Sequence, residues 1–429
     1  MKIILTLLVY TFIVVLEFSG SSSLLSFQNI CLILLPIFAI VYQLVTNKIN
    51  NSFFVNIKTK PIKFIIAFYL LGILSLFYSY DFNSSLDYMI KFTLCLLFVL
   101  VCCREQKFWV KLKDILFYAS TFVGVTILIT TIYPNMFIDH FSFLLPPTSG
   151  RMEMYLSELR QGIYSGILFE RGYAAFSLNI GLCCFISDYF SKKNVSKIKV
   201  LCFIVLLISL FCTGKRTLFI IPIVSFIVLS ILNNKNKNIT ITMLKIAPVI
   251  LIIIVLVINF VPSSKKVFER LSFDENGTMS IRNESYWNYA IDMFKDKTFL
   301  GYGISTYASY LSNFRSDQLY YAHNIYLQIA GELGIIGILI FLIFIISNYF
   351  LNLKLLKYGK LGDNNLLLIN FSICIQNLFI IYGLTGNPMY YFSQLLFYLI
   401  SISISSCVYD DIQKSNEIRK LTIKSQHKF

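Results

Sequence analysis

Long apolar segments separated by polar connections make up most of this chain. A helix needs about 20 mostly apolar residues to cross a bilayer, and twelve segments of the chain are of this kind. They lie near residues 3–18, 23–46, 63–79, 86–103, 114–133, 163–190, 198–213, 217–232, 246–262, 325–349, 366–384 and 388–408. The pattern predicts an all-α polytopic membrane protein with about 12 transmembrane helices.

The composition supports this prediction. Of the 429 residues, 57% are hydrophobic and only 14% are charged, far from the usual makeup of a soluble domain. The first residues resemble a signal peptide, because Lys2 precedes an apolar stretch. No A-x-A-like cleavage site follows, so we expect this stretch to remain as the first span.

The distribution of charge predicts the orientation. The net charge is +15, but most of the 37 Lys and Arg residues lie in alternate connections and form no basic strip. This distribution follows the positive-inside rule and gives no reason to expect a nucleic-acid partner. We therefore expect an inner (cytoplasmic) membrane protein with both termini in the cytoplasm.

Two connections on the predicted exterior side are long, near residues 134–162 and 263–322. Long ordered loops usually have a function. The chain then divides into helices and one exterior loop over 1–262, a second exterior loop over 263–322, three helices over 323–408 and a basic tail over 409–429. Ser263–Ala322 is expected outside the cytoplasm and Lys354–Lys360 inside.

The second loop contains an amphipathic stretch, "SIRNESYWNYAIDMFKD". We expect a helix capped by Ser280, with an apolar face formed by Trp287, Ala290, Ile291 and Phe294. The opposite face is formed by Arg282, Tyr286 and Tyr289. This face is either part of a site or only a solvated surface. The following "LGYGISTY" is expected to be a turn, since a lone G-Y-G is weak support for a phosphate cradle.

His323, one of only three histidines, lies at the exterior end of the tenth span. An imidazole with a pKa near 6.5 is suited to act as a base there; the alternative is a polar cap at the membrane interface. On the helix that follows, Ala330, Gly334 and Gly337 are expected on the same side as His323, which lets a neighbouring helix approach closely.

Several cations also lie on the exterior side. Lys215 and Arg216 occupy a very short turn in "CTGKRTLF", and Arg270 and Arg282 precede His323 in the second loop. Arg171 falls within the sixth span near its exterior end, where ionisable residues are costly and usually functional. Arginine forks bind phosphate oxygens, so these cations predict a diphosphate site. The alternative is lipid-headgroup anchors and local pairs.

Neither a metal nor a disulfide is indicated. All ten cysteines lie inside or at the ends of apolar spans, and we expect no cofactor.

Three stretches resemble the O-antigen polymerase and O-antigen ligase family of bacterial envelope glycosyltransferases. They are "TGKRT" (213–217), "RNESYWNYAIDMFKDKTFLGYG" (282–303) and "HNIYLQIAGELGIIG" (323–337). The last is similar to the family block H-N-x-x-L-x-x-x-x-E-x-G, and its asparagine, Asn324, is expected to contact the substrate. The resemblance covers roughly the C-terminal half of the chain. "LFERGYAAF" departs from the G-x-x-x-N-P-N-like stretch of many relatives, so Arg171 is a candidate by position only.

The resemblance implies a GT-C-like membrane enzyme that needs no metal and acts at the periplasmic face. Its donor would be an oligosaccharide on undecaprenyl diphosphate, and its acceptor a hydroxyl of a glycan lipid. His323 matches the proposed general base, Arg216 and Arg282 match the arginines assigned to the diphosphate, and Arg270 matches another loop arginine. Membrane lipids are expected neighbours, and a chain-length regulator remains open as a further partner.

A polymerase that joins lipid-linked repeat units is the leading hypothesis. A ligase that transfers the glycan to lipid A-core is the close alternative. A flippase or transporter would show repeated halves and ionisable groups near mid-membrane, whereas here the candidate residues gather at the exterior side. A structural scaffold would leave His323 and Arg216 unexplained.

Overall fold

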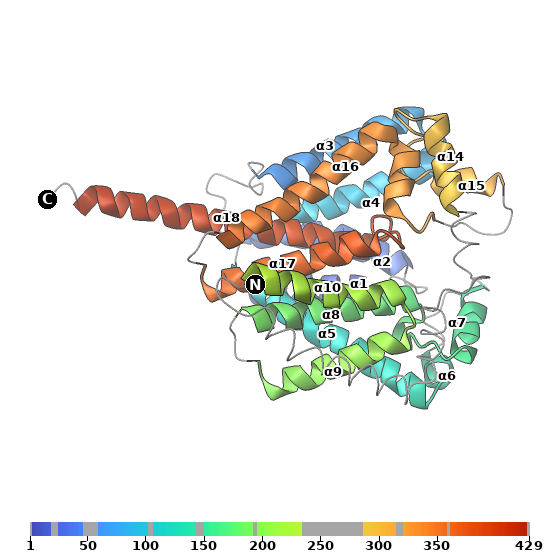
Figure 1. Cartoon of the computed structure of the whole chain (residues 1–429), viewed down its shortest axis with the longest axis horizontal. Helices are drawn as coiled ribbons and strands as arrows, with labels where there is room; N and C mark the ends of the chain where they lie inside the picture. The colour runs from blue at the N-terminus through green and yellow to red at the C-terminus, as the bar shows by residue number, and fades with distance from the viewer. Residues whose placement is uncertain are drawn as a thin grey trace.

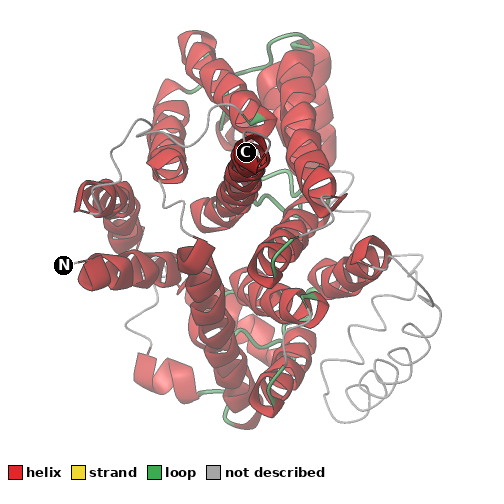
Figure 2. Cartoon of the chain, turned by 90° about the vertical axis from the view of Figure 1, so that its left-hand side faces the viewer, coloured by secondary structure: helices red, strands yellow, loops and turns green. Residues whose placement is uncertain are grey.

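The protein is helical throughout the part that the structure describes. The computed structural model describes residues 2–18, 25–45, 59–101, 106–141, 150–191, 195–233, 286–314, 321–357 and 361–426. Within these ranges the chain forms helices joined by turns and no strand (Figure 2). The all-α prediction is confirmed.

A helix coincides with every predicted span that falls in these ranges. These helices are α1 (Lys2–Phe18), α2 (Leu25–Val45), α3 (Lys60–Ser75), α4 (Phe82–Val101), α5 (Gln106–Ile132), α8 (Arg171–Phe190), α9 (Lys197–Cys212), α10 (Arg216–Asn233), α16 (Ile325–Lys357), α17 (Asp363–Tyr382) and α18 (Phe392–Gln426). Eight helices among the described residues are long and apolar enough to cross a membrane. The predicted span at 246–262 lies outside the described residues, so the count of twelve stays a prediction.

Several helix boundaries differ from the predicted ones, among them the start of α5 at Gln106 and the end of α16 at Lys357. The sixth span was expected to begin near residue 163, but α8 begins at Arg171, after a short 3-10 turn at Gly166–Leu168. Phe169 adopts a left-handed conformation (φ 54°) between these elements, which ends the turn. At the other end of the chain, α18 continues without a break past residue 408 to Gln426.

The centre of the bundle is formed by α8, α17 and α18, the most buried of the apolar helices. Small polar side chains connect α16, α17 and α18 there. Asn352 donates a hydrogen bond to Ser372 Oγ (3.1 Å) and accepts one from Ser405 Oγ (2.9 Å). Serine and asparagine side chains commonly join transmembrane helices in this way. Seen along the helices, the end of α18 projects from the middle of the bundle (Figure 2).

Four short helices gather at one end of the bundle: α6 (Met136–Phe141), α7 (Gly150–Arg160), α14 (Asn288–Asp296) and α15 (Tyr307–Ser312). Both chain termini lie toward the opposite end (Figure 1). The described parts of the two long connections, 134–162 and 263–322, therefore share one end, which we call the loop end. This is the arrangement that the alternation of positive charge predicts.

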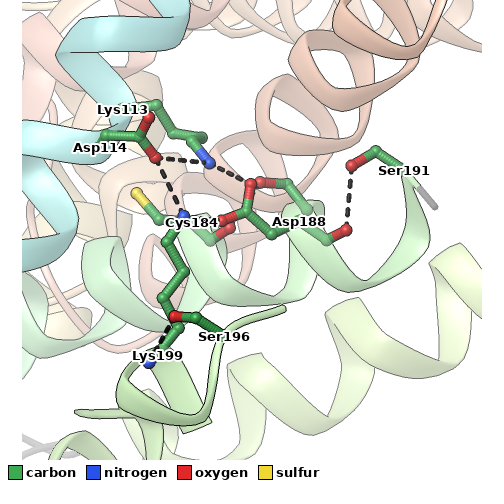
Figure 3. A network of polar contacts seen from close by, with 8 residues as sticks. Lys113, Asp114, Cys184, Asp188, Ser191, Ser196 and Lys199 are labelled. Carbon is green, nitrogen blue, oxygen red and sulfur yellow. Dashed lines mark hydrogen bonds and ion pairs between the residues drawn. The ribbon is translucent and has the colours of Figure 1, made fainter. Parts of the chain in front are cut away.

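An ion network joins α5, α8 and α9 at the other end (Figure 3). The carboxylate of Asp188 contacts the ammonium groups of Lys113 and Lys199, the latter at 2.6 Å. Asp114 contacts the same two lysines, each at 3.2 Å. Lys113 and Asp188 are nearly fully buried. Since each charge has partners of opposite sign, the network stabilises the positions of these three helix ends.

Candidate active site

The histidine predicted as a base lies in the turn before α16. His323 has a left-handed backbone conformation (φ 53°), and α16 begins two residues later at Ile325. Asn324 caps this helix, because its Oδ1 accepts hydrogen bonds from the backbone N–H groups of Tyr326 (3.0 Å) and Leu327 (3.2 Å). The carboxamide oxygen of Asn324 is thus used within the protein, where the sequence predicted a substrate contact.

The predicted alignment of Ala330, Gly334 and Gly337 with His323 on one helical face is wrong. His323 precedes the helix, and α16 is interrupted at Gly334, whose backbone is non-helical (φ 64°, ψ −164°). A Cβ atom at Gly334 would lie 2.3 Å from the carbonyl oxygen of Phe299. Only glycine therefore fits this position. The interruption lets Ile335 N donate a hydrogen bond to Thr298 O at 2.7 Å.

The stretch predicted as a turn, 300–307, is non-helical up to Thr306, with Tyr307 as the first residue of α15, and it lies against this interruption. Gly303 N donates a hydrogen bond to the backbone oxygen of Glu332 at 2.7 Å. A Cβ atom at Gly301, which has φ 67°, would lie 2.4 Å from the same oxygen. The glycines of "LGYG" therefore serve close backbone packing, and this region of the chain lies next to α16.

The amphipathic helix also packs on α16. In α14 the buried residues are Ala290 and Met293, and a Cβ at Gly331 would lie 2.9 Å from Ala290 O. Tyr286 and Tyr289, predicted on the opposite face, pack against the same small core. That prediction is wrong, because the chain segments around 302–311 and 322 cover this side of α14 as well.

Tyr286 is the aromatic neighbour of the candidate base. Its ring lies 6.2 Å from the His323 ring, with the planes nearly perpendicular at 84°. The hydroxyl of Tyr307 donates a hydrogen bond to Tyr286 O at 2.7 Å. Two sequence candidates, Tyr286 and His323, are thus brought together.

A second candidate segment, at the start of α10, contacts the turn that follows α17. α10 begins at Arg216 after the tight turn at Thr213–Gly214, as expected from "CTGKRTLF". Thr217 accepts a hydrogen bond from Thr385 Oγ1 at 2.9 Å. Gly383 O accepts one from Ile325 N, also at 2.9 Å. The three residues from Gly383 to Thr385 therefore contact both the start of α10 and the start of α16.

Arg171 has an internal partner. It is the first residue of α8, and Glu170 caps the helix by accepting hydrogen bonds from Gly172 N (2.8 Å) and Tyr173 N (3.1 Å). The Nε of Arg171 lies 3.0 Å from Oε1 of Glu158, a buried residue of α7. Arg171 is thus the first residue of the candidate membrane span Arg171–Phe190, at one end of that span as expected.

Burial raises the pKa of Glu158 from its ordinary value, while the positive charges of Arg171 and Lys215 act in the opposite direction. The pair Arg171–Glu158 therefore fixes α7 against α8, and Lys215 is close enough to Glu158 to affect its charge. Part of the positive charge at the loop end is thus balanced by the protein itself.

Arg270, Arg282 and Ser280 lie outside the described residues. Among the residues that are described, no three His, Cys, Asp or Glu side chains form a group able to hold a metal ion.

Residues 201–342 match the family model described as O-Antigen ligase. This part of the chain is similar to the O-antigen polymerase and ligase family, in agreement with the resemblance of its motifs. It contains Arg216, Tyr286, His323 and Asn324, but not Arg171. No curated protein sequence matches the chain.

Glu332 was assigned no role from the sequence, although the O-antigen family block contains a glutamate at its place. Its side chain is fully buried and accepts four hydrogen bonds. Oε1 accepts from Tyr307 N (3.1 Å) and Gln328 Nε2 (3.0 Å), and Oε2 accepts from Ser305 N (2.6 Å) and the Tyr390 hydroxyl (2.6 Å). A charged residue in an otherwise apolar helix is the signal that could have identified it.

Proposed function

We propose that this protein is a polymerase of a surface polysaccharide, which joins repeat units carried on undecaprenyl diphosphate. The transfer takes place at the periplasmic face of the inner membrane. The O-antigen ligase match over residues 201–342 supports a lipid-linked glycan as substrate. The observation that carries the proposal is the turn from Gly383 to Thr385, which contacts the chain beside both His323 and Arg216.

His323 acts as the general base in this proposal. It accepts the proton of the acceptor hydroxyl as that oxygen attacks the anomeric carbon of the donor. A single positioned base contributes typically about 10²- to 10⁴-fold to a rate. Tyr286, perpendicular to the imidazole, limits the orientations of the ring. The attack is in line with the leaving diphosphate, so the anomeric configuration inverts.

Arg216 holds the diphosphate, together with Arg282 and Arg270 from the loop and with Lys215 beside it. Negative charge develops on the leaving oxygen as the glycosidic bond breaks, and fixed cations stabilise that charge. Because Arg171 is paired with Glu158, we assign it to the packing of α7 and give it a smaller part in binding. The proposed reaction uses protein side chains alone, without a metal.

The ligase is the second candidate, favoured by the description of the matching family model. Both enzymes would share the donor and the base and would differ in the acceptor. Purified protein in nanodiscs, given only undecaprenyl-diphosphate repeat units, should build a ladder of longer glycans. If a product forms only after lipid A-core is added, the protein is a ligase. If neither mixture gives a product although the protein is folded, the proposed function is wrong.

A further inference from the structure

We infer that Glu332 is a positioning residue for His323. This inference rests on the proposed function only where it concerns transfer, because the structural part concerns contacts within the protein. Glu332 lies nine residues after His323. Its carboxylate accepts hydrogen bonds from Ser305, Tyr307, Gln328 and Tyr390. Three series of contacts lead from this carboxylate to the immediate neighbours of His323.

The first route passes through Gln328. This side chain donates to Glu332 Oε1 at 3.0 Å, which turns its own oxygen toward the turn before α16. That oxygen accepts hydrogen bonds from Ala322 N at 3.2 Å and from Asn387 Nδ2 at 2.5 Å. Ala322 directly precedes His323. The carboxylate thus decides which end of the Gln328 amide faces the backbone beside the histidine.

The second route passes through Tyr390. Its hydroxyl donates to Glu332 Oε2, and its ring stacks on that of Tyr321 with centroids 5.7 Å apart and an angle of 29° between the planes. Tyr321 lies two residues before His323. This contact therefore links the carboxylate to the backbone segment before His323.

The third route reaches the aromatic neighbour of the imidazole. Tyr307 N donates to Glu332 Oε1, and the hydroxyl of the same tyrosine donates to Tyr286 O at 2.7 Å. The Tyr286 ring lies against His323. One buried carboxylate therefore positions both the backbone that precedes His323 and the aromatic ring of Tyr286 beside it.

The strained backbone of His323 explains why such support is needed. A non-glycine residue with φ near 53° persists only where surrounding contacts fix it. Each oxygen of Glu332 accepts hydrogen bonds from two donors. A glutamine at this position would place its NH₂ group, itself a donor, against two of these donors. Glu332→Gln keeps the shape of the side chain, replaces one acceptor oxygen with an NH₂ donor and removes the capacity for negative charge.

The experiment uses the full chain in nanodiscs, with ¹³C- and ¹⁵N-labelled histidine. The protein has only three histidines, so the His323 signal is identified as the one that a His323→Gln variant lacks. The matched control is Asp188→Asn, which also neutralises a buried carboxylate but in the network at the other end of α8 (Figure 3). Asp188 lies about 25 Å from Arg171 along that helix.

We expect Glu332→Gln to shift or broaden the His323 signal and to lower turnover by roughly 10²-fold, as misplacement of a catalytic group by about 1 Å does. The KM for the lipid-linked donor should change less than threefold. Tyr390→Phe removes one of the four donors and should change the signal in the same direction by a smaller amount. Asp188→Asn should leave the His323 signal and turnover unchanged, even if it lowers thermal stability.

An unchanged His323 signal in both Glu332→Gln and Tyr390→Phe would overturn the inference. If Glu332→Gln does not fold, Tyr390→Phe decides alone. The two proposals fail in different ways. A wild-type protein that makes no product contradicts the proposed function, whereas the histidine signal still shows whether Glu332 determines the surroundings of His323.

Discussion

Thr385 donates a hydrogen bond to Thr217 across 168 residues of sequence, with 2.9 Å between the two hydroxyl oxygens. The contact joins the turn after α17 to the second residue of α10, next to Arg216. The same turn also contacts the start of α16, because Gly383 O accepts a hydrogen bond from Ile325 N. Two threonines whose hydroxyls are in contact have Cβ atoms close together. A disulfide between cysteines at the same two positions requires Cβ atoms about 3.5–4.5 Å apart, which is compatible with this contact.

The first prediction uses this contact. Thr217→Cys combined with Thr385→Cys should form an internal disulfide under mild oxidation, whereas either single variant should not. Counting of alkylated thiols by mass spectrometry measures the loss of two reactive groups in the double variant. If the double variant keeps both thiols after oxidation, the two segments are not in contact and the site does not combine Arg216 with His323.

The second prediction concerns the interruption of α16. Gly334→Ala should destabilise the protein by at least about 1–3 kcal/mol, the typical cost of a backbone conformation that only glycine adopts readily, and should lower transfer. Gly362→Ala is the matched control, because a Cβ there meets no atom within 4 Å. Thermal unfolding in detergent compares the two variants. Equal melting temperatures for both would contradict the described contact between Gly334 and Phe299.

The third prediction concerns Glu158 and pH. Burial raises the pKa of this carboxyl in the folded protein above its ordinary value of 4.5, so the folded state holds the proton more tightly than the unfolded state. Its contribution to stability should be fully present below about pH 4.5 and should be lost as the pH rises through the raised pKa.

Glu158→Gln should remove this part of the pH dependence, and Arg171→Ala should strengthen it, because Arg171 opposes the rise of the pKa. Melting temperatures measured between pH 4 and pH 7 test both variants against the unmodified protein. Identical pH profiles for all three proteins would show that the Arg171–Glu158 pair does not act as described.

The fourth prediction concerns the orientation in the membrane. Ser312 is exposed at the loop end, and Gly362 is exposed in a connection that the charge pattern predicts to be cytoplasmic. Ser312→Cys should react with an impermeant thiol reagent in intact spheroplasts, and Gly362→Cys only after lysis. Asn276→Cys, in the loop outside the described residues, should behave like Ser312→Cys. The reverse pattern would place the candidate site in the cytoplasm.

The helices could be predicted from the sequence because each apolar segment carries its own signal. Eleven of the predicted spans coincide with helices, and the turn at Thr213–Gly214 lies where "TGKRT" predicts it. The start of α8 was missed, since the apolar residues at 163–169 continue the hydrophobic pattern while their backbone forms a 3-10 turn.

The relations within the site could be predicted only in part. His323 and Arg216 were identified by type and position, but nothing local indicates that the turn at Gly383–Thr385 lies between them. The hydrophobic periodicity also predicted a continuous helix through Gly334. The interruption there depends on contact with Phe299, which is distant in sequence, so it does not alter the local hydrophobic pattern. Glu332 was missed for a similar reason: its four donors come from three separate segments.

The most direct test of the central claim compares unmodified and His323→Ala protein, both purified in nanodiscs, with undecaprenyl-diphosphate repeat units as the sole substrate. We predict that the unmodified protein forms a ladder of glycans, and that His323→Ala binds the donor but forms product at least about 10²-fold more slowly. Equal melting temperatures of the two proteins would exclude a folding defect. A folded His323→Ala protein that forms product at the unmodified rate would contradict the account.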